Sequence, residues 1–245
     1  MSKVIYDNEG FFKKYSQMAR SKDGLAGAGE WPTLKKMLPD FKGQTILDLG
    51  CGYGWHCRYA RDQGATKVIG IDASYRMLEK AKEMTTDETI VYLCHDIQDL
   101  DFDEKMFDSV ISSLVFHYLP SFEKICDQVK RVLKPKGEFV FSVEHPIFTA
   151  QGKQDWDYDD EGNIRDWPVD DYFIEGKREA VFLGETMTKY HRTLTTYLKD
   201  LLNAGFEILD VQEPMPPKEM LDTVPGMKDE LRRPMMLLVK ARLKD

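Results

Sequence analysis

The chain has 245 residues, of which 42% are hydrophobic and 31% charged, as is usual for a folded globular protein. Its net charge of −8 argues against a nucleic-acid-binding surface, which is usually basic, and its four cysteines form no C-x-x-C pair that would indicate a zinc site. No run approaches the roughly 18 apolar residues of a membrane span, and no signal-peptide core begins the chain. We therefore expect a cytoplasmic protein with no metal site and no membrane or nucleic-acid partner.

Residues 1–40 are predicted to be mainly helical. Between residues 6 and 20, aromatic side chains and Met18 recur at near-helical spacing. The small residues 25–29 (LAGAG) predict a flexible loop. Pro32 suits the first turn of a second helix, which would end near Leu38.

The stretch 45–54 (TILDLGCGYG) predicts a short apolar strand that runs into a glycine-rich turn. Residues 55–63 have helical composition, and residues 67–72 (KVIGID) predict a second strand ending in a carboxylate. Glycines let a ligand approach the backbone closely, and a helix N-terminus presents free N–H groups. Asp72 stands about 20 residues beyond the turn, where an acid can accept bonds from ribose hydroxyls. The pattern predicts a βαβ unit that binds a nucleotide.

The glycine spacing helps to choose between nucleotides. A dinucleotide site uses G-x-G-x-x-G, whose third glycine permits close packing of helix and strand. Counted from Gly50, that third position holds Trp55, whereas the third glycine is Gly54, one place early. Asp48, just before the first glycine, is poorly suited to a pyrophosphate and well suited to a positively charged ligand. S-adenosylmethionine carries an ammonium and a sulfonium but no phosphate.

Further along the chain, predicted strands and helices alternate. The predicted strands are 89–93, 106–113, 138–143, 206–212 and 235–242, and the predicted helices are 75–84, 121–133 and 193–203. Ser74 is a plausible cap for the first of these helices, and Gly205 should stop the last one. A turn at residues 133–137 (LKPKG) should separate the helix 121–133 from the next strand.

The pattern D-L-G-C-G-Y-G followed by G-I-D-A-S resembles the class I S-adenosylmethionine-dependent methyltransferases. The segments F-D-S-V-I-S at 107–112 and L-K-P-K-G at 133–137 resemble the same family in the same order. E-H-P at 144–146 and Y-H-R-T at 190–193 resemble its small-molecule members. The resemblance implies an α/β, Rossmann-like methyltransferase fold: a mostly parallel seven-stranded sheet with helices on both faces and a reversed edge strand.

We interpret residues 1–245 as a single methyltransferase domain with four parts. Residues 1–40 would form an N-terminal helical cover, 41–145 the cofactor-binding core, 146–190 a substrate-cap insertion, and 191–245 a C-terminal helix and edge hairpin. The insertion places several aromatic residues among many acids, a composition that can line a small-molecule pocket. A solvated β-hairpin or a dimer contact is the alternative for this insertion.

The resemblance implies S-adenosylmethionine as cofactor, together with a set of binding positions. Residues of the cover would bind its carboxylate end, and the acid that ends the second strand would bind its ribose. Residues at the start of the next helix and after the third strand would contact its adenine. Others would lie at the end of the fourth strand and in the loop that follows. The predicted residues are Tyr15, Arg20, Asp48, Gly50, Cys51, Gly52, Asp72, Ala73, Met77, Asp96, Ile97, Ser112 and His117. Core packing for Tyr15 and Met77, an exposed loop for Asp96 and a structural role for His117 are alternatives.

Methyl transfer from a sulfonium is an in-line displacement at an already activated carbon, so the enzyme mainly aligns the acceptor and excludes water. A base helps where the acceptor must lose a proton. His145 and His191 are the candidate bases, because the ordinary pKa of histidine lies near neutrality, and Glu144 would orient them. Alternatively, His145 only caps the strand end and His191 belongs to the cap.

The sequence thus predicts an S-adenosylmethionine-dependent methyltransferase that acts on an O, N or C atom of a small-molecule acceptor. The motif N-P-P-Y, which serves exocyclic base amines, does not follow the fourth strand, where residues 112–114 are S-S-L. The acidic and aromatic insertion suggests a cationic or aromatic acceptor. A non-catalytic S-adenosylmethionine-binding protein and an NAD-dependent oxidoreductase are the alternatives.

Overall fold

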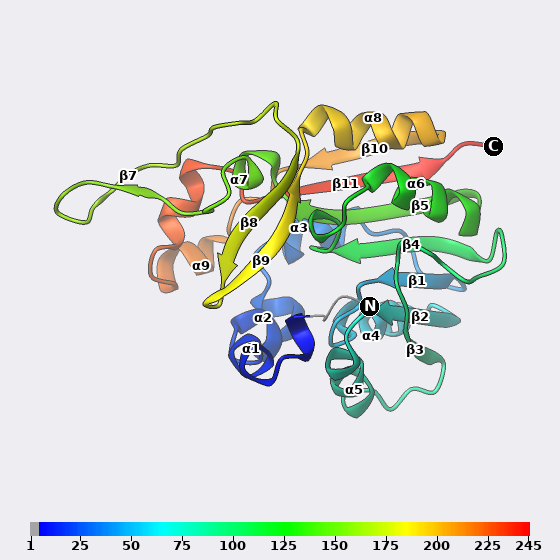
Figure 1. Ribbon diagram of the computed structural model, residues 1–245. Helices are drawn as coiled ribbons and strands as arrows, with labels where there is room; N and C mark the ends of the chain where they lie inside the picture. The colour runs from blue at the N-terminus through cyan, green and yellow to red at the C-terminus, as the bar shows by residue number, and fades with distance from the viewer. Residues whose placement is uncertain (1–4) are drawn as a thin grey trace.

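A seven-stranded sheet forms the centre of the computed structural model, which describes residues 5–245 (Figure 1). Its strand order is β10–β11–β5–β4–β1–β2–β3. The strands are β1 Thr45–Leu49, β2 Lys67–Asp72, β3 Ile90–Cys94, β4 Phe107–Ser113, β5 Leu133–Glu144, β10 Phe206–Gln212 and β11 Met236–Leu243. Neighbouring strands from β5 to β3 are parallel, whereas β11 is antiparallel to both β5 and β10. The predicted fold class is confirmed, and the reversed strand is β11, which lies between β5 and the edge strand β10.

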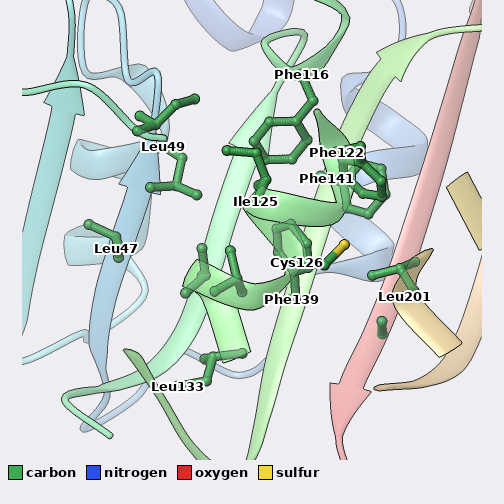
Figure 2. Packing of buried hydrophobic residues seen from close by; sticks show 14 of the residues in the cluster. Leu47, Leu49, Phe116, Phe122, Ile125, Cys126, Leu133, Phe139, Phe141 and Leu201 are labelled. Carbon is green, nitrogen blue, oxygen red and sulfur yellow. The ribbon is translucent and has the colours of Figure 1, made fainter. Parts of the chain in front are cut away.

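Helices cover both faces of this sheet because alternate residues of each strand point to opposite sides. Leu47 and Leu49 of β1 join an apolar cluster beneath α6 and α8 (Figure 2). Ile46 joins a second cluster on the other face, beneath α3, α4 and α5. The helices are α3 Trp31–Met37, α4 Trp55–Asp62, α5 Tyr75–Glu83, α6 Phe122–Val132 and α8 Leu194–Ala204. Among residues 5–245, no helix combines the length and apolarity that crossing a membrane requires.

The predicted helix boundaries rest on caps that the structure contains. The Ser74 hydroxyl accepts the N–H of Met77 at the start of α5. Gly205 adopts the left-handed conformation after α8, and Pro32 lies in the first turn of α3. These local signals confirm the start or end of three elements.

The N-terminal cover is more broken than predicted. It consists of η1 Ile5–Asp7, α1 Glu9–Tyr15, α2 Ala19–Lys22 and η2 Gly24–Gly27, and residues 1–4 lie outside the described part of the chain. The near-helical spacing over residues 6–20 thus corresponds to α1 and the start of α2, with a break at residues 16–18. The Asn8 side chain caps α1 by accepting the N–H of Phe11, and the Ser16 hydroxyl donates to the Lys13 carbonyl at the other end.

The turn predicted at residues 133–137 is part of β5. Leu133 pairs with Phe107 and Glu138 pairs with Ser109, so the four β5 residues 134–137 lie opposite the single β4 residue Asp108. Lys136 has a positive φ of 63° within this irregular stretch. The proline and glycine therefore bend the strand without ending its pairing.

The insertion after β5 folds mainly as two hairpins. Helix α7 Pro146–Thr149 comes first, followed by β6 Asp157–Tyr158 with β7 Ile164–Asp166, and by β8 Gly176–Phe182 with β9 Glu185–His191. The hairpin β8–β9 crosses the carboxyl end of the sheet (Figure 1). Between β10 and β11 the chain forms α9 Lys218–Thr223 and η4 Met227–Arg232.

Candidate active site

The loop after β1 is shaped by its glycines. Gly50, Gly52 and Gly54 all have positive φ. A Cβ atom on Gly50 would collide with Val115, and one on Gly54 would collide with the hydroxyl of Tyr92. Only glycine therefore lets the loop lie this close to its neighbours.

A partly open cavity lies between this loop and the N-terminal cover. The loop contributes Gly50, Cys51 and Gly52, and the cover contributes Tyr15 and Arg20. The cavity thus unites five of the predicted cofactor-binding residues.

Several polar atoms around the cavity have no hydrogen-bond partner among residues 5–245. Three belong to residues that line the cavity: the hydroxyls of Ser21 and Tyr53 and the indole N–H of Trp55. The fourth is one carboxylate oxygen of Glu30, which lies behind the cavity residue Arg20. Glu30 is 2% exposed and uses its other oxygen to bind the Arg20 guanidinium. Buried polar groups are costly when unpaired, so this set indicates a polar ligand. Its donors and acceptors fit the ammonium and carboxylate at the methionine end of S-adenosylmethionine.

The carboxyl ends of β2 and β3 form the adjoining part of the site. One Asp72 oxygen accepts the N–H of Gly52 at 2.9 Å, and the other accepts that of Ser74 at 2.9 Å. Burial raises the pKa of Asp72, and these hydrogen bonds oppose the increase. The Asp96 carboxylate is exposed at the end of β3, and the next residue, Ile97, is buried.

The other predicted residues near the loop differ in exposure. Met77 is buried, and its methyl group lies beneath Gly52. Ala73 is exposed at the end of β2. The Ser112 hydroxyl is buried and donates to the Leu49 carbonyl at 2.7 Å, so Ser113, one residue further, is the serine that lines the cavity.

Asp48 lies beneath the glycine loop and does not line the cavity. It is 1% exposed, and one of its oxygens accepts the thiol of Cys57 at 3.2 Å. Burial raises the pKa of this carboxyl group to about 7. Any effect of Asp48 on a cationic ligand therefore acts through the loop and depends on the protonation of this group.

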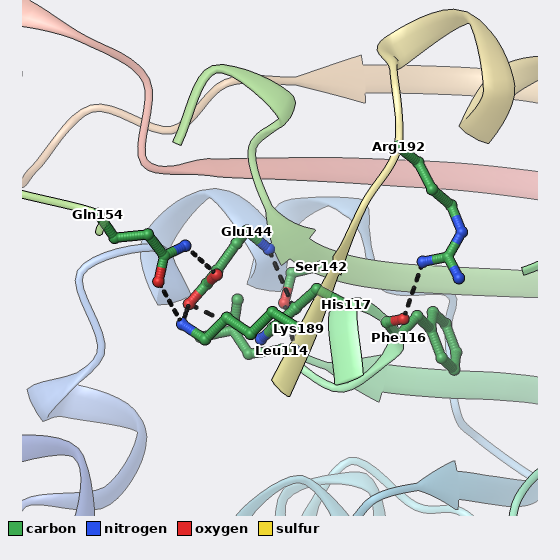
Figure 3. Close-up of polar contacts among 8 residues, drawn as sticks. All are labelled: Leu114, Phe116, His117, Ser142, Glu144, Gln154, Lys189 and Arg192. Atoms are coloured by element: carbon green, nitrogen blue, oxygen red, sulfur yellow. Dashed lines mark hydrogen bonds and ion pairs between the residues drawn. The ribbon is translucent and has the colours of Figure 1, made fainter. Parts of the chain in front are cut away.

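A second polar cluster lies at the carboxyl end of β5 (Figure 3). The ammonium of Lys189 is 2.5 Å from Glu144 Oε1 and donates to the Gln154 side-chain oxygen at 2.7 Å. The Gln154 amide donates in turn to Glu144 Oε2 at 2.8 Å. These contacts close a ring of three side chains from β5, the segment after α7, and β9. We call it the polar ring.

His117 lies against the polar ring, in the short helix η3 Phe116–Tyr118. Its Nδ1 accepts the backbone N–H of Glu144 at 3.3 Å, and its Nε2 is 3.8 Å from Glu144 Oε1. Burial lowers the pKa of His117 to about 4, so the imidazole of His117 is neutral at pH 7. Burial alone would raise the pKa of Glu144, but the Lys189 ammonium and the hydrogen bonds from Lys189 and Gln154 outweigh it and lower the pKa. Glu144 is therefore an ionised carboxylate with one hydrogen bond to each oxygen.

The N-terminal segment connects the cofactor side of the site to the polar ring. The Asp7 carboxylate accepts the Ser74 hydroxyl at 2.6 Å, close to Asp72. The adjacent Tyr6 packs edge-on against Tyr15 at 5.3 Å. Tyr6 also lies close to Tyr118, whose ring lies 5.9 Å from the Lys189 ammonium.

The cover and the hairpin β8–β9 also meet each other. The ring of Phe11 in α1 lies 6.0 Å from that of Phe182 at the end of β8. The Lys14 ammonium donates to the Leu183 carbonyl at the hairpin tip, at 3.0 Å. The carboxyl end of the sheet is thus covered from two directions.

The two predicted histidine bases are engaged in structural contacts. Nδ1 of His145 accepts the N–H of Ile147 at the start of α7, and Nε2 lies 2.8 Å from a Glu213 oxygen. His191 is fully buried between the Thr149 hydroxyl and the Tyr172 carbonyl, each at 2.8 Å. Since a carbonyl can only accept, Nε2 of His191 carries the proton. These contacts favour the structural alternative for both, and the base role stays a prediction.

Sequence reasoning missed several residues of the site. Lys189, Gln154 and Tyr118 were not predicted, and neither were the cavity residues Ser21 and His56. Lys189 and Gln154 belong to an insertion without a recognised motif. The only available signal was their place between E-H-P and Y-H-R-T.

Comparisons with known proteins agree with the class that the fold and the glycine loop define. Residues 47–141 match the family model described as a methyltransferase domain. The structure of a putative S-adenosylmethionine-dependent methyltransferase from Listeria monocytogenes is 53% identical, with a TM-score of 0.86, over 91% of this chain and 100% of that one. A second such methyltransferase, from Mesorhizobium loti, is 43% identical with a TM-score of 0.83, over 89% of this chain and 100% of that one.

The chain belongs to the class I S-adenosylmethionine-dependent methyltransferases. It is therefore an enzyme, and S-adenosylmethionine is its cofactor. An uncharacterised protein of Haemophilus influenzae is 32% identical over 97% of this chain and 96% of that protein.

Shorter matches include methyltransferases with different acceptors. A tRNA U34 carboxymethyltransferase from Hahella chejuensis is 33% identical over 46% of this chain and 36% of that protein. A sarcosine/dimethylglycine N-methyltransferase from Halorhodospira halochloris is 31% identical over 40% of this chain and 36% of that protein. These similarities support the class of enzyme and leave the acceptor undetermined.

Proposed function

We propose that this enzyme transfers a methyl group to an O, N or C atom of a small molecule held between Ser113 and the polar ring. The observation that carries the proposal is the double cover over the carboxyl end of the sheet. Lys14 bonds to the hairpin tip at Leu183, and Phe11 contacts Phe182. A site closed by two elements of the same chain suits an acceptor small enough to be enclosed. The net charge of −8 also disfavours a polyanionic acceptor.

The predicted cofactor-binding residues are assigned within this proposal. Arg20 and Tyr15 would lie at the methionine end, and Asp72 would bind the ribose. Asp96 and Ile97 would bind the adenine, with Met77 packed beside it. Asp72 is suited to its role because its carboxylate is already oriented by the N–H groups of Gly52 and Ser74. Ser113 would then lie close to the reacting methyl group.

When bound, S-adenosylmethionine supplies an activated methyl group, so the protein contributes mainly alignment and exclusion of water. The side chains of Tyr6 and Tyr118 would enclose the acceptor beside the polar ring. Lys189 and Gln154 keep Glu144 ionised and fixed, so Glu144 would orient the acceptor by accepting a hydrogen bond. Of the three predicted catalytic residues, Glu144 is the one that belongs to this cluster.

The proposal is tested by measuring S-adenosylhomocysteine formation with panels of small amines, phenols and carboxylic acids, and separately with bulk tRNA. We expect turnover with members of a small-molecule panel and none with tRNA. Asp72→Asn should abolish that turnover and serves as the control for background hydrolysis. Turnover with tRNA alone would contradict the proposal and would move the acceptor site to the outer surface.

A further inference from the structure

Three aromatic side chains of the insertion surround an arginine from the other end of the chain. Phe148 and Trp167 are stacked at 4.9 Å, and Trp156 packs edge-on against Trp167 at 5.1 Å. The Arg233 guanidinium lies over all three rings, 4.7 Å from Phe148, 4.9 Å from Trp156 and 4.2 Å from Trp167. We call these three rings the aromatic box. Two of these rings, Trp156 and Trp167, are among the aromatic residues of the insertion that could line a pocket, and here they enclose a cation of the protein itself.

Arg233 is well fixed in this box. It is 7% exposed, and two of its nitrogens bind the two Glu230 oxygens at 2.7 and 3.1 Å. The preceding Arg232 donates to the backbone carbonyls of Ile164 and Arg165 in β7. The connection between β10 and β11 therefore binds the insertion through two consecutive arginines. A planar guanidinium that both stacks and forms paired hydrogen bonds is not replaceable by lysine.

The segment between α7 and β6 contains Gln154, the one member of the polar ring that lies outside a helix or strand. Gln154 has a φ of 52°, in the left-handed region that a residue with a side chain rarely adopts. Such a conformation persists only where the surroundings impose it. Phe148 precedes Gln154 and Trp156 follows it, so the aromatic box fixes the chain on both sides of this residue.

We propose that Arg233 is a positioning residue of the acceptor site: by filling the aromatic box, it holds Gln154 in place to complete the polar ring with Glu144 and Lys189. Calling the polar ring part of the acceptor site rests on the function proposed above. The coupling of Arg233 to Gln154 can be tested without an acceptor. Failure to find an acceptor would therefore leave this inference standing, and failure of the coupling would leave the proposed function standing.

The test is a double-mutant cycle followed by urea unfolding. Arg233→Met removes the charge and keeps much of the stem, and Gln154→Ala removes one member of the polar ring. If Arg233 acts by placing Gln154, the shift in unfolding midpoint of the double variant will be smaller than the sum of the two single shifts. Additive shifts would overturn the inference. Arg233→Lys is measured in parallel, because it disturbs folding less and should show the same non-additivity.

A matched control cycle combines Gln154→Ala with Arg242→Met. Arg242 also forms an ion pair with a glutamate, Glu207, but on the β10–β11 ladder. These two shifts should be additive. Non-additivity of the same size in the control would show that the cycle reports general loosening, and would overturn the inference.

Two further measurements localise the effect. Trypsin should cut the Arg233→Met variant faster at Lys153 and Arg165, which are exposed on either side of Trp156. Titration calorimetry with S-adenosylhomocysteine should give an unchanged dissociation constant, because the segment does not line the cofactor cavity. Unchanged cleavage, or a clear loss of S-adenosylhomocysteine affinity, would contradict a positioning role confined to the polar ring.

Discussion

Asp48 is a buried carboxylate whose ionisation should make stability depend on pH. Burial raises its pKa to about 7 in the folded protein, against about 3.9 in an unfolded chain. Between these values the folded state holds a proton that the unfolded state has lost. Stability from this group is therefore greatest below about pH 4 and falls as the pH rises to about 7. We expect Asp48→Asn to lack this part of the pH dependence.

Urea unfolding of the natural protein and of Asp48→Asn at pH 5 and pH 8 checks this expectation. The natural protein should lose more unfolding free energy between the two pH values than the variant does. The difference between the two proteins isolates Asp48 from the other titrating groups. Equal losses would mean that the carboxylate is ionised throughout this range, with Cys57 compensating for its burial.

At the residue scale, the sequence predicts those parts of the site that adjacent strands bring together. Gly50 and Asp72 end neighbouring parallel strands, so a local pattern is enough to place them side by side. The polar ring is different, because Lys189 and Glu144 are 45 residues apart and meet only when the insertion folds. His145 and His191 were chosen by residue type. Three of their four ring nitrogens are hydrogen-bonded to backbone or side-chain partners that no sequence pattern reveals.

At the scale of elements, hydrophobic alternation and capping residues were sufficient to predict the strands of the sheet and most of the helices that cover it. The spacing of residues 6–20 did not reveal where the helices of the N-terminal cover begin and end, because the Asn8 and Ser16 side chains bind backbone groups at the two ends of α1. Hydrophobic alternation also failed to define the insertion, whose hairpins are held by distant contacts. Arg178, for example, donates to the carbonyl of Ala150 across 28 residues.

The contact between the hairpin β8–β9 and the cover should control release of the cofactor. Phe182→Ala removes the ring that lies 6.0 Å from Phe11. An aromatic contact contributes about 0.5–1.5 kcal/mol, which corresponds to a factor of about 2–13 in rate. We expect S-adenosylhomocysteine to dissociate faster by about this factor, as measured by stopped-flow displacement. Val181→Ala is the matched control, because Val181 is 67% exposed on the opposite face of the same strand. Equal rates for the two variants would mean that the cover opens independently of the hairpin.

At the scale of the whole molecule, the cofactor site joins segments that are far apart in the chain. Tyr15 and Arg20 come from the cover, Gly50 from the loop after β1, and Ser113 from the end of β4. A ligand that contacts all of them stabilises the entire fold, since unfolding any one of these segments removes the site. Binding should therefore raise the temperature of the single cooperative unfolding transition.

S-adenosylmethionine at about 100 times its dissociation constant adds about 2.7 kcal/mol of stability, which corresponds to a rise of about 5–11 °C in Tm for a chain of this size. NAD should cause no rise, because the glycine loop lacks the third glycine of a dinucleotide site. Asp72→Asn should reduce the rise with S-adenosylmethionine, since Asp72 is the carboxylate proposed to bind the ribose. Asp99→Asn, which changes an exposed acid on the loop after β3, should retain the full rise. If Asp72→Asn retained it too, the cofactor would be held by the cover and the glycine loop without the end of β2.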